Sequence, residues 1–217
     1  RRWMMATVKD VLNIARKELG TKESPANSNN VKYNTWFYGH AVRDTSAIKY
    51  PWCMAFVQWC FAQAGQTLPC KTASCSALLN FYRQNFPECV KAKPNVGDIV
   101  IYTFGHTGIV ESVSSGEFAA IEGNTSVSGS QSNGGEVCRK TRKLYTAEAF
   151  IRPEYAKEGP KLDNKPSPAH EKGVQWAVQN GILNGNQQGD LMLSQPVTRQ
   201  QLCSILYNYH RKFGKDG

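Results

Sequence analysis

Residues 50–64 read Tyr-Pro-Trp-Cys-Met-Ala-Phe-Val-Gln-Trp-Cys-Phe-Ala-Gln-Ala, and Gly65 follows them. Proline suits the first position of a helix and glycine the position past its end, so this stretch predicts a helix from Pro51 to about Ala64. Its apolar body predicts a buried position. Cys53 falls in the first turn, where unpaired N–H groups and the helix dipole stabilise a thiolate, so we expect an accessible, reactive side chain there. For Cys53 alone, the alternative of a small buried hydrophobic residue stays open.

Around this helix the apolar residues recur with two different periods. Helical spacing predicts a helix over 7–19, with a capping box of Thr7 and Asp10, and another helix opened by Ser74. Short β-rich runs separated by Gly and Ser turns follow. Helices first and strands afterwards predict an α+β domain with an antiparallel sheet. The expected strands cover 98–103, 107–113 and 117–121, with a last strand through 137–139 and then 150–152.

The chain carries a net charge of +9 at pH 7, which favours polyanionic partners. The basic residues are scattered except for Arg139-Lys140 and Arg142-Lys143, which we interpret as a solvated strand edge. No run approaches the roughly 18 apolar residues of a membrane span. The basic start at Arg1 has no apolar stretch after it, so we expect synthesis in the cytoplasm without a signal peptide.

Seven cysteines are present, and their spacing is unlike that of a disulfide framework or a zinc site. Their number is odd, no two show C-x-x-C spacing, and no histidine lies near Cys70 or Cys75. Cys60, two helical turns beyond Cys53, is expected to be a core residue.

A thiolate nucleophile needs a base, and His106 is the best placed of four histidines. It follows an expected strand and a glycine, whereas His40 precedes the helix and His170 and His210 lie near the C-terminus. A turn histidine without a role is the alternative. The run Glu122-Gly123-Asn124 after the next strand supplies two polar side chains, either of which can orient the imidazole. The order is therefore a cysteine on a helix, a histidine beside a strand, and a polar acceptor after the next strand.

Four stretches of sequence accompany this order: Tyr-Pro-Trp-Cys-Met-Ala-Phe-Val (50–57), Pro-Asn-Val-Gly-Asp-Ile-Val-Ile-Tyr (94–102), Gly-His-Thr-Gly-Ile-Val (105–110) and Ile-Glu-Gly-Asn-Thr (121–125). Together they resemble the CHAP domain (cysteine, histidine-dependent amidohydrolase/peptidase) of phage endolysins and bacterial autolysins. The resemblance covers 20–153 and implies a papain-like fold over a catalytic domain of 5–153. It implies that Cys53 attacks an amide carbonyl of peptidoglycan, that His106 moves the proton, and that Glu122 or Asn124 orients His106. We add Tyr50 as a candidate oxyanion donor beside the Cys53 N–H.

Some members of this family bind calcium through aspartates ahead of the nucleophile. The corresponding loop here offers Asn27, Asn29 and Asn30, with Asp44 as the nearby carboxylate. Hard cations prefer more carboxylate oxygens than this loop supplies. We therefore expect no required metal and no other cofactor.

A linker over 154–168 and a helical segment over 169–217 are expected after the domain, with helices near 169–180 and 198–212. It contains Trp176-Ala-Val-Gln-Asn-Gly-Ile-Leu183 and then Val197-Thr-Arg-Gln-Gln-Leu202. These stretches resemble a single S-layer homology motif, which implies binding of a secondary wall polymer near Thr198 and Arg199. The alternatives are a helical cap that stabilises the domain or mediates self-association, and a DNA-binding pair of helices. Residues 153–217 hold 8 Lys and Arg against 6 Asp and Glu, which argues against DNA.

The resemblance to the CHAP domain therefore implies a peptidoglycan hydrolase that cuts an amide bond of the cell wall after release from the cytoplasm. Its activity would be that of an N-acetylmuramoyl-L-alanine amidase or an endopeptidase. The expected partners are peptidoglycan and an anionic wall polymer, without nucleic acid. The alternatives are a non-catalytic wall-binding protein on a CHAP scaffold and a papain-like protease of proteins.

Overall fold

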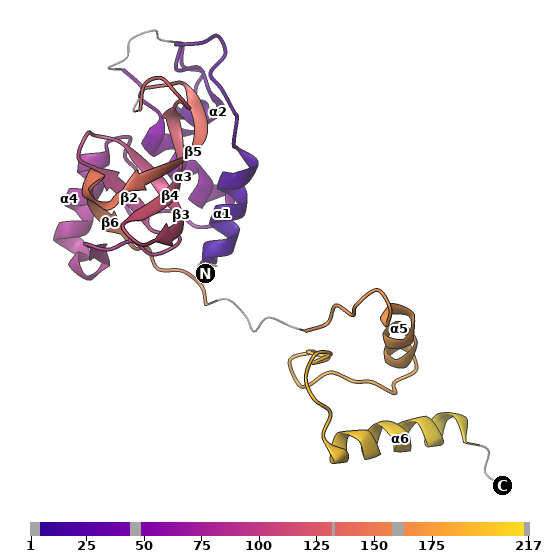
Figure 1. Cartoon of the computed structure of the whole chain (residues 1–217). Helices are drawn as coiled ribbons and strands as arrows, with labels where there is room; N and C mark the ends of the chain where they lie inside the picture. The colour runs from indigo at the N-terminus through magenta and orange to yellow at the C-terminus, as the bar shows by residue number, and fades with distance from the viewer. Residues whose placement is uncertain (1–4, 44–48, 132, 158–162, 215–217) are drawn as a thin grey trace. The chain divides into compact units, whose positions relative to one another are not determined.

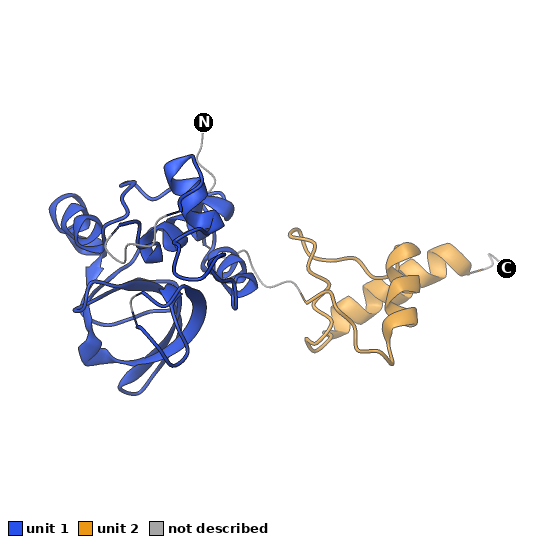
Figure 2. Cartoon of the chain, turned by 90° about the horizontal axis from the view of Figure 1, so that it is seen from above, with its two compact units in different colours: residues 1–157 blue, residues 158–217 orange. Residues whose placement is uncertain are grey.

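The computed structural model describes residues 5–43, 49–131, 133–157 and 163–214. The chain divides into two compact units, Arg1–Lys157 and Glu158–Gly217, which Figure 2 shows in separate colours. Over the described residues the N-terminal unit contains four α-helices and an antiparallel sheet, and the C-terminal unit contains two α-helices. The α+β class predicted from the sequence is therefore confirmed.

The helices of the N-terminal unit follow the expected order, with one addition. The helix α1 begins at the predicted capping box of Thr7 and Asp10, and α4 begins after Ser74, whose hydroxyl accepts a hydrogen bond from the Ala77 N–H. The short helix α2 was not predicted, because its seven residues are too few to show a clear period. The bounds are α1 Val8–Lys17, α2 Lys32–Tyr38, α3 Cys53–Gln63 and α4 Cys75–Asn85.

The central helix α3 starts two residues later than predicted, so Pro51 is not helical. Tyr50 has a left-handed φ of 61°, and Trp52 occupies the N-cap position. Trp52 is held there by its indole N–H, which donates to Glu23 Oε1 at 2.7 Å. As a consequence Cys53 is the first helical residue, at the positive end of the helix dipole.

The sheet has six strands in the order β1-β6-β2-β3-β4-β5, and every pairing is antiparallel. The expected last strand is in fact two strands joined by a short 3-10 turn, because β5 and β6 pair with opposite parts of the sheet. The β4 strand also runs to Thr125, so Glu122 lies inside it and not beyond its end. The strands are β1 Val90–Lys91, β2 Ile99–Tyr102, β3 Thr107–Ser114, β4 Glu117–Thr125, β5 Glu136–Lys143 and β6 Ala147–Ile151 (Figure 1).

Apolar side chains cover both faces of the sheet. Ile99 and Ile101 of β2 belong to the main core, which includes the helices, whereas Val100 and Tyr102 belong to a second cluster on the opposite face. The helix α3 packs against β3 and β4. Because β2 is covered on both sides, all four of its residues are buried. This arrangement brings α3 next to β3, which His106 immediately precedes, and next to β4, which carries Glu122.

The residues expected to begin the linker are instead attached to the N-terminal unit. The Tyr155 ring stacks on Phe61 at 5.9 Å between centroids, and its hydroxyl donates to the Gly97 carbonyl at 2.6 Å. The Ala156 N–H donates to the Ala6 carbonyl at 2.9 Å. An aromatic ring with a paired hydroxyl gains from burial, which explains why this segment docks.

The C-terminal unit has the two predicted helices, α5 Glu171–Gln179 and α6 Arg199–Phe213. Thr198 and Gln201 form the expected capping box. Asp163, which was expected in the linker, accepts hydrogen bonds from the backbone N–H and hydroxyl of Ser194. Among the described residues of this unit, only Ile182 is buried.

Candidate active site

Cys53 lies at the N-terminus of α3 and is 3% exposed. The expectation of an accessible side chain is therefore wrong, because Cys53 belongs to the main core cluster. Its Sγ is 3.9 Å from Sγ of Cys75, the first residue of α4. The site at Cys53 is thus formed where two helix N-termini meet.

His106 lies immediately before β3 and is fully buried. Its Nε2 is 3.1 Å from Oε2 of Glu122, and this contact fixes which ring nitrogen faces the carboxylate. Its Nδ1 is buried and makes no hydrogen bond with the described residues. Nδ1 is therefore the nitrogen that is free to exchange a proton with a nucleophile.

Glu122 is fully buried and accepts hydrogen bonds from three side chains. The Tyr102 hydroxyl donates to Oε1 at 2.6 Å, while Arg142 donates to Oε1 from Nε at 2.9 Å and to Oε2 from Nη2 at 2.6 Å. With His106, four donors converge on the two oxygens. Such a carboxylate is fixed in position and stays ionised.

Sequence reasoning missed Tyr102 and Arg142. Arg142 was interpreted as part of a solvated strand edge, but its side chain is mostly buried against Glu122. It lies on β5, whose residue Cys138 pairs with Glu122, and its position on the same face follows from the two-residue period. In the sequence Arg142 is one of four neighbouring basic residues, and nothing distinguishes it from the other three. The register of the strands was needed to show that it faces Glu122.

The electrostatics of these residues favour a thiolate and a protonated imidazole. The Cys75 thiol has the largest influence and lowers the pKa of Cys53; burial opposes it, and His106 lowers that pKa further. Burial alone would lower the pKa of His106, but its interactions with Cys53 and Glu122 raise it to about 9. Burial raises the pKa of Glu122, and Arg142 and His106 outweigh this effect and lower it.

Asn124 and Tyr50, the other two expected site residues, have different surroundings. Asn124 donates from Nδ2 to Asn133 and accepts from the Gly135 N–H, so its side chain holds the loop before β5. Glu122, not Asn124, is the acceptor beside His106. Tyr50 packs its ring edge-on against Tyr38 at 5.0 Å, two residues before the helix.

The remaining cysteine prediction concerns Cys60. It is fully buried in the main core, as expected. Burial, followed by the nearby charge of Glu18, raises the pKa of its thiol well above the ordinary value. Cys60 is therefore a neutral core residue in a position unsuited to nucleophilic attack.

The loop that contains Asn27, Asn29 and Asn30, where some family members bind calcium, has few carboxylates. Asn27 and Asn29 have left-handed backbone angles, and the side-chain amide of Asn29 donates to the Lys49 carbonyl. Asp44 lies outside the described residues. In the described part of the chain, His, Cys, Asp and Glu nowhere gather in a group of three or more that suits a metal ion.

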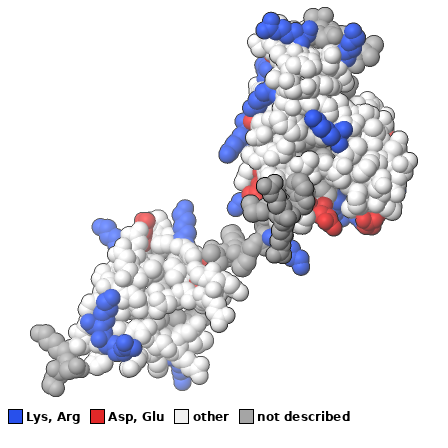
Figure 3. All heavy atoms as spheres, turned by 180° about the vertical axis from the view of Figure 1, so that it is seen from behind, with Lys and Arg blue, Asp and Glu red and all other residues white. Residues whose placement is uncertain are grey.

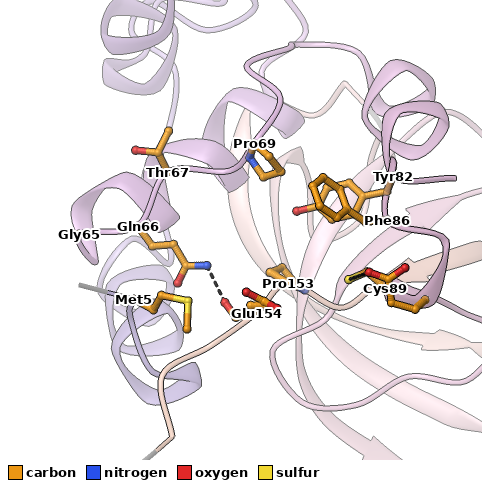
Figure 4. A pocket seen from close by; sticks show the side chains of 11 residues that line it. Met5, Gly65, Gln66, Thr67, Pro69, Tyr82, Phe86, Cys89, Pro153 and Glu154 are labelled. Carbon is orange, nitrogen blue, oxygen red and sulfur yellow. Dashed lines mark hydrogen bonds between the residues drawn. The ribbon is translucent and has the colours of Figure 1, made fainter. Parts of the chain in front are cut away.

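Two surface features lie away from Cys53. A pocket of about 280 Å³ is lined by residues that include Gln66, Tyr82 and Glu154, and neither Cys53 nor His106 lines it (Figure 4). Lys and Arg side chains are dispersed on the face shown in Figure 3.

In the C-terminal unit the Thr198 hydroxyl accepts a hydrogen bond from the Gln201 N–H, and Arg199 is the first residue of α6. Among the described residues, no helix is both long enough and apolar enough to cross a membrane.

Comparison with family models finds a similarity over the part of the chain that holds this site. The family model of the CHAP domain matches residues 45–124, a range that contains Cys53, His106 and Glu122. Residues 45–124 are therefore similar to a CHAP domain. The crystal structure of the wild-type endolysin LysIME-EF1 aligns with a TM-score of 0.46 and 15% identity, over 81% of this chain and 86% of that one. No curated protein sequence matches significantly.

Proposed function

We propose that the N-terminal unit is a cysteine-dependent peptidoglycan hydrolase. The observation that carries this proposal is the buried pair of His106 and Glu122, 3.1 Å apart, beside a cysteine at a helix N-terminus. This is the nucleophile, base and orienting group of covalent amide hydrolysis. The match to a CHAP domain supports peptidoglycan as the substrate.

In the proposed reaction the Cys53 thiolate attacks the carbonyl carbon of an amide. The negative charge moves to the carbonyl oxygen, where the N–H groups at the start of α3 can stabilise it, with Tyr50 as a further candidate donor. Protonated His106 then gives its Nδ1 proton to the leaving amine, and an acyl-enzyme remains on Cys53. Water, deprotonated at the same Nδ1, hydrolyses this thioester and regenerates the thiolate.

Glu122 and Arg142 act in this scheme as positioning residues. Glu122 accepts a hydrogen bond from the Nε2–H of His106 and so keeps Nδ1 directed to the reacting atoms. Arg142 and Tyr102 hold the carboxylate by three further hydrogen bonds. Loss of any of these contacts would allow the imidazole to rotate away from the nucleophile.

The bond that is cut is one of two kinds. An N-acetylmuramoyl-L-alanine amidase cuts the amide between muramic acid and L-alanine, and an endopeptidase cuts a peptide bond of the stem or cross-bridge. Mass spectrometry of digested peptidoglycan distinguishes the two. New amino termini on the alanine that was joined to muramic acid indicate an amidase, whereas new termini within the stem or cross-bridge indicate an endopeptidase.

We further propose that the C-terminal unit tethers the enzyme to an anionic wall polymer, with Thr198 and Arg199 near the ligand. The net positive charge of the chain and the exposed position of Arg199 support this role. The protein would act on the cell wall after release from the cytoplasm.

A comparison of Cys53→Ala with Cys60→Ala on purified walls tests the catalytic proposal. Zymography should show a cleared band for wild type and Cys60→Ala and none for Cys53→Ala or His106→Ala. Circular dichroism of each variant checks that the fold is retained. A cleared band from folded Cys53→Ala would show that another residue is the nucleophile.

A further inference from the structure

A second thiol lies next to the proposed nucleophile, although no bond-making or bond-breaking step of the amide hydrolysis described above uses it. Sγ of Cys75 is 3.9 Å from Sγ of Cys53, and Cys75 is only 7% exposed. The two residues are 22 positions apart in the sequence and come from different helices. Their proximity is therefore a product of the fold.

The geometry of the two helices brings these sulfurs together. Each cysteine is the first residue of its helix, α3 or α4, and the Ser74 hydroxyl caps α4 through the Ala77 N–H. A disulfide has an S–S distance of about 2.0 Å. The sulfurs must therefore approach by about 2 Å, which rotation of two first-turn side chains and a small shift of the helix ends can provide.

The two thiols also differ in reactivity. The surroundings lower the pKa of Cys53, whereas its proximity to Cys53, together with burial, raises that of Cys75. A thiolate is the form that reacts with peroxides, so Cys53 is oxidised first. Cys75 then lies in contact with the oxidised sulfur.

We propose that Cys75 is a resolving cysteine, which converts oxidised Cys53 into a reversible Cys53–Cys75 disulfide when the enzyme meets a hydroperoxide. This inference rests on the proposed role of Cys53 as nucleophile. In the first step the Cys53 thiolate attacks one oxygen of hydrogen peroxide; an S–O bond forms, the O–O bond breaks, and hydroxide leaves. In the second step Cys75 sulfur attacks the sulfenic sulfur of Cys53; the S–S bond forms, the S–O bond breaks, and water leaves.

The balance of the two steps is complete with the peroxide as oxidant. The two sulfurs lose two electrons to the peroxide. Cys75 gives up its thiol proton in the second step, and the hydroxide released in the first step takes the proton of protonated His106, so the peroxide becomes two molecules of water. While the disulfide exists, Cys53 has no thiolate and hydrolysis stops. Because a disulfide can be reduced, the nucleophile is protected from irreversible oxidation to the sulfinic acid.

Peptide mapping of the full-length protein after peroxide treatment tests the disulfide directly. Free thiols are alkylated, and trypsin is used without reductant. Cleavage after Lys49, Lys71 and Arg83 places Cys53 in the peptide 50–71 and Cys75 in the peptide 72–83. We expect these peptides to be joined with the loss of two hydrogen atoms, and fragmentation should assign the link to Cys53 and not to Cys60 or Cys70.

The variants Cys75→Ser and Cys203→Ser test the protective role. Each is treated with peroxide and then with dithiothreitol, and its wall-lytic rate is compared with its own untreated rate. Wild type and Cys203→Ser should recover, whereas recovery of Cys75→Ser should be at least about tenfold lower, with Cys53 found as sulfinic acid. Cys203 is exposed and lies in the other unit, so its variant controls for disulfides between molecules.

The outcomes separate this inference from the proposed hydrolase activity. Equal recovery of wild type and Cys75→Ser, or a link from Cys53 to a cysteine other than Cys75, would overturn the inference. Untreated wild type that cannot cleave peptidoglycan would instead overturn the proposed function. The cross-linked peptides remain measurable in that case, because they are detected by mass and not by activity.

Discussion

The substitution Glu122→Gln probes the centre of the proposed site with almost no change in side-chain shape. Four donors from His106, Tyr102 and Arg142 converge on the two carboxylate oxygens. Glutamine keeps one oxygen and replaces the other with an NH₂ group, which is itself a donor. Two of the four donors therefore lose their acceptor, and the buried Arg142 charge loses its partner.

The expected loss of stability follows from these contacts. A buried donor without an acceptor costs about 1–3 kcal/mol, so two of them cost about 2–6 kcal/mol. Removal of one member of a buried ion pair costs about 3–5 kcal/mol. We therefore expect the free energy of unfolding of the Glu122→Gln variant to fall by about 3–5 kcal/mol. For a unit of this size, the corresponding decrease in Tm is about 6–20 °C.

The kcat/KM of the Glu122→Gln variant should fall further than its loss of stability explains. Without the carboxylate the imidazole is no longer held with Nδ1 toward Cys53, so we expect kcat/KM to fall about 10²–10⁴-fold at a temperature where the variant is folded. The measurements are thermal unfolding followed by circular dichroism, and turnover of a soluble muropeptide.

Glu117→Gln is the matched control, because Glu117 lies on the same strand and pairs with exposed Lys143. Exposed ion pairs contribute about 0–1 kcal/mol, so this variant should unfold and react much like wild type. If Glu122→Gln is as stable and as active as Glu117→Gln, the assignment of Glu122 as the group that positions His106 is refuted.

Four further predictions concern pH, the core, metal ions and the C-terminal unit. Because the folded-state pKa of His106 is raised from 6.5 to about 9, its protonated ring stabilises the fold below pH 6.5, and this contribution is lost as the pH rises through about 9. The pH profile of kcat/KM should fall near the same pH, and earlier in Glu122→Gln; an unchanged alkaline limb in that variant would contradict the assignment. Cys60→Ala should lose about 1–2 kcal/mol in denaturant unfolding but keep its muropeptide turnover, and an inactive folded variant would indicate a catalytic role for Cys60. Turnover should survive EDTA, and loss of activity that calcium restores would establish a metal requirement. A chain ending at Lys157 should keep muropeptide turnover but bind purified walls less in a pull-down, and Arg199→Ala should reproduce part of this loss. Equal wall binding by all forms would exclude the tethering role.

Local sequence patterns determined most of the helices and strands of this protein. The apolar periods, the capping boxes of Thr7 and Thr198, and the Ser74 cap each act over a few residues, so they can be identified without the fold. The order along the chain of Cys53, His106 and the polar pair of Glu122 and Asn124, together with the motifs around them, also indicated the resemblance to the CHAP domain.

Only the tertiary structure decided which side chains meet around Cys53. The choice of Glu122 over Asn124 depends on the register of β3, β4 and β5, and a shift of one residue would turn every side chain to the other face. Two further contacts also join residues that are distant in the sequence. Arg142 lies 20 positions from Glu122, and Cys75 lies 22 positions from Cys53. Such contacts depend on how strands pair and where helices end in space, and these long-range arrangements leave no periodic signal in a single sequence.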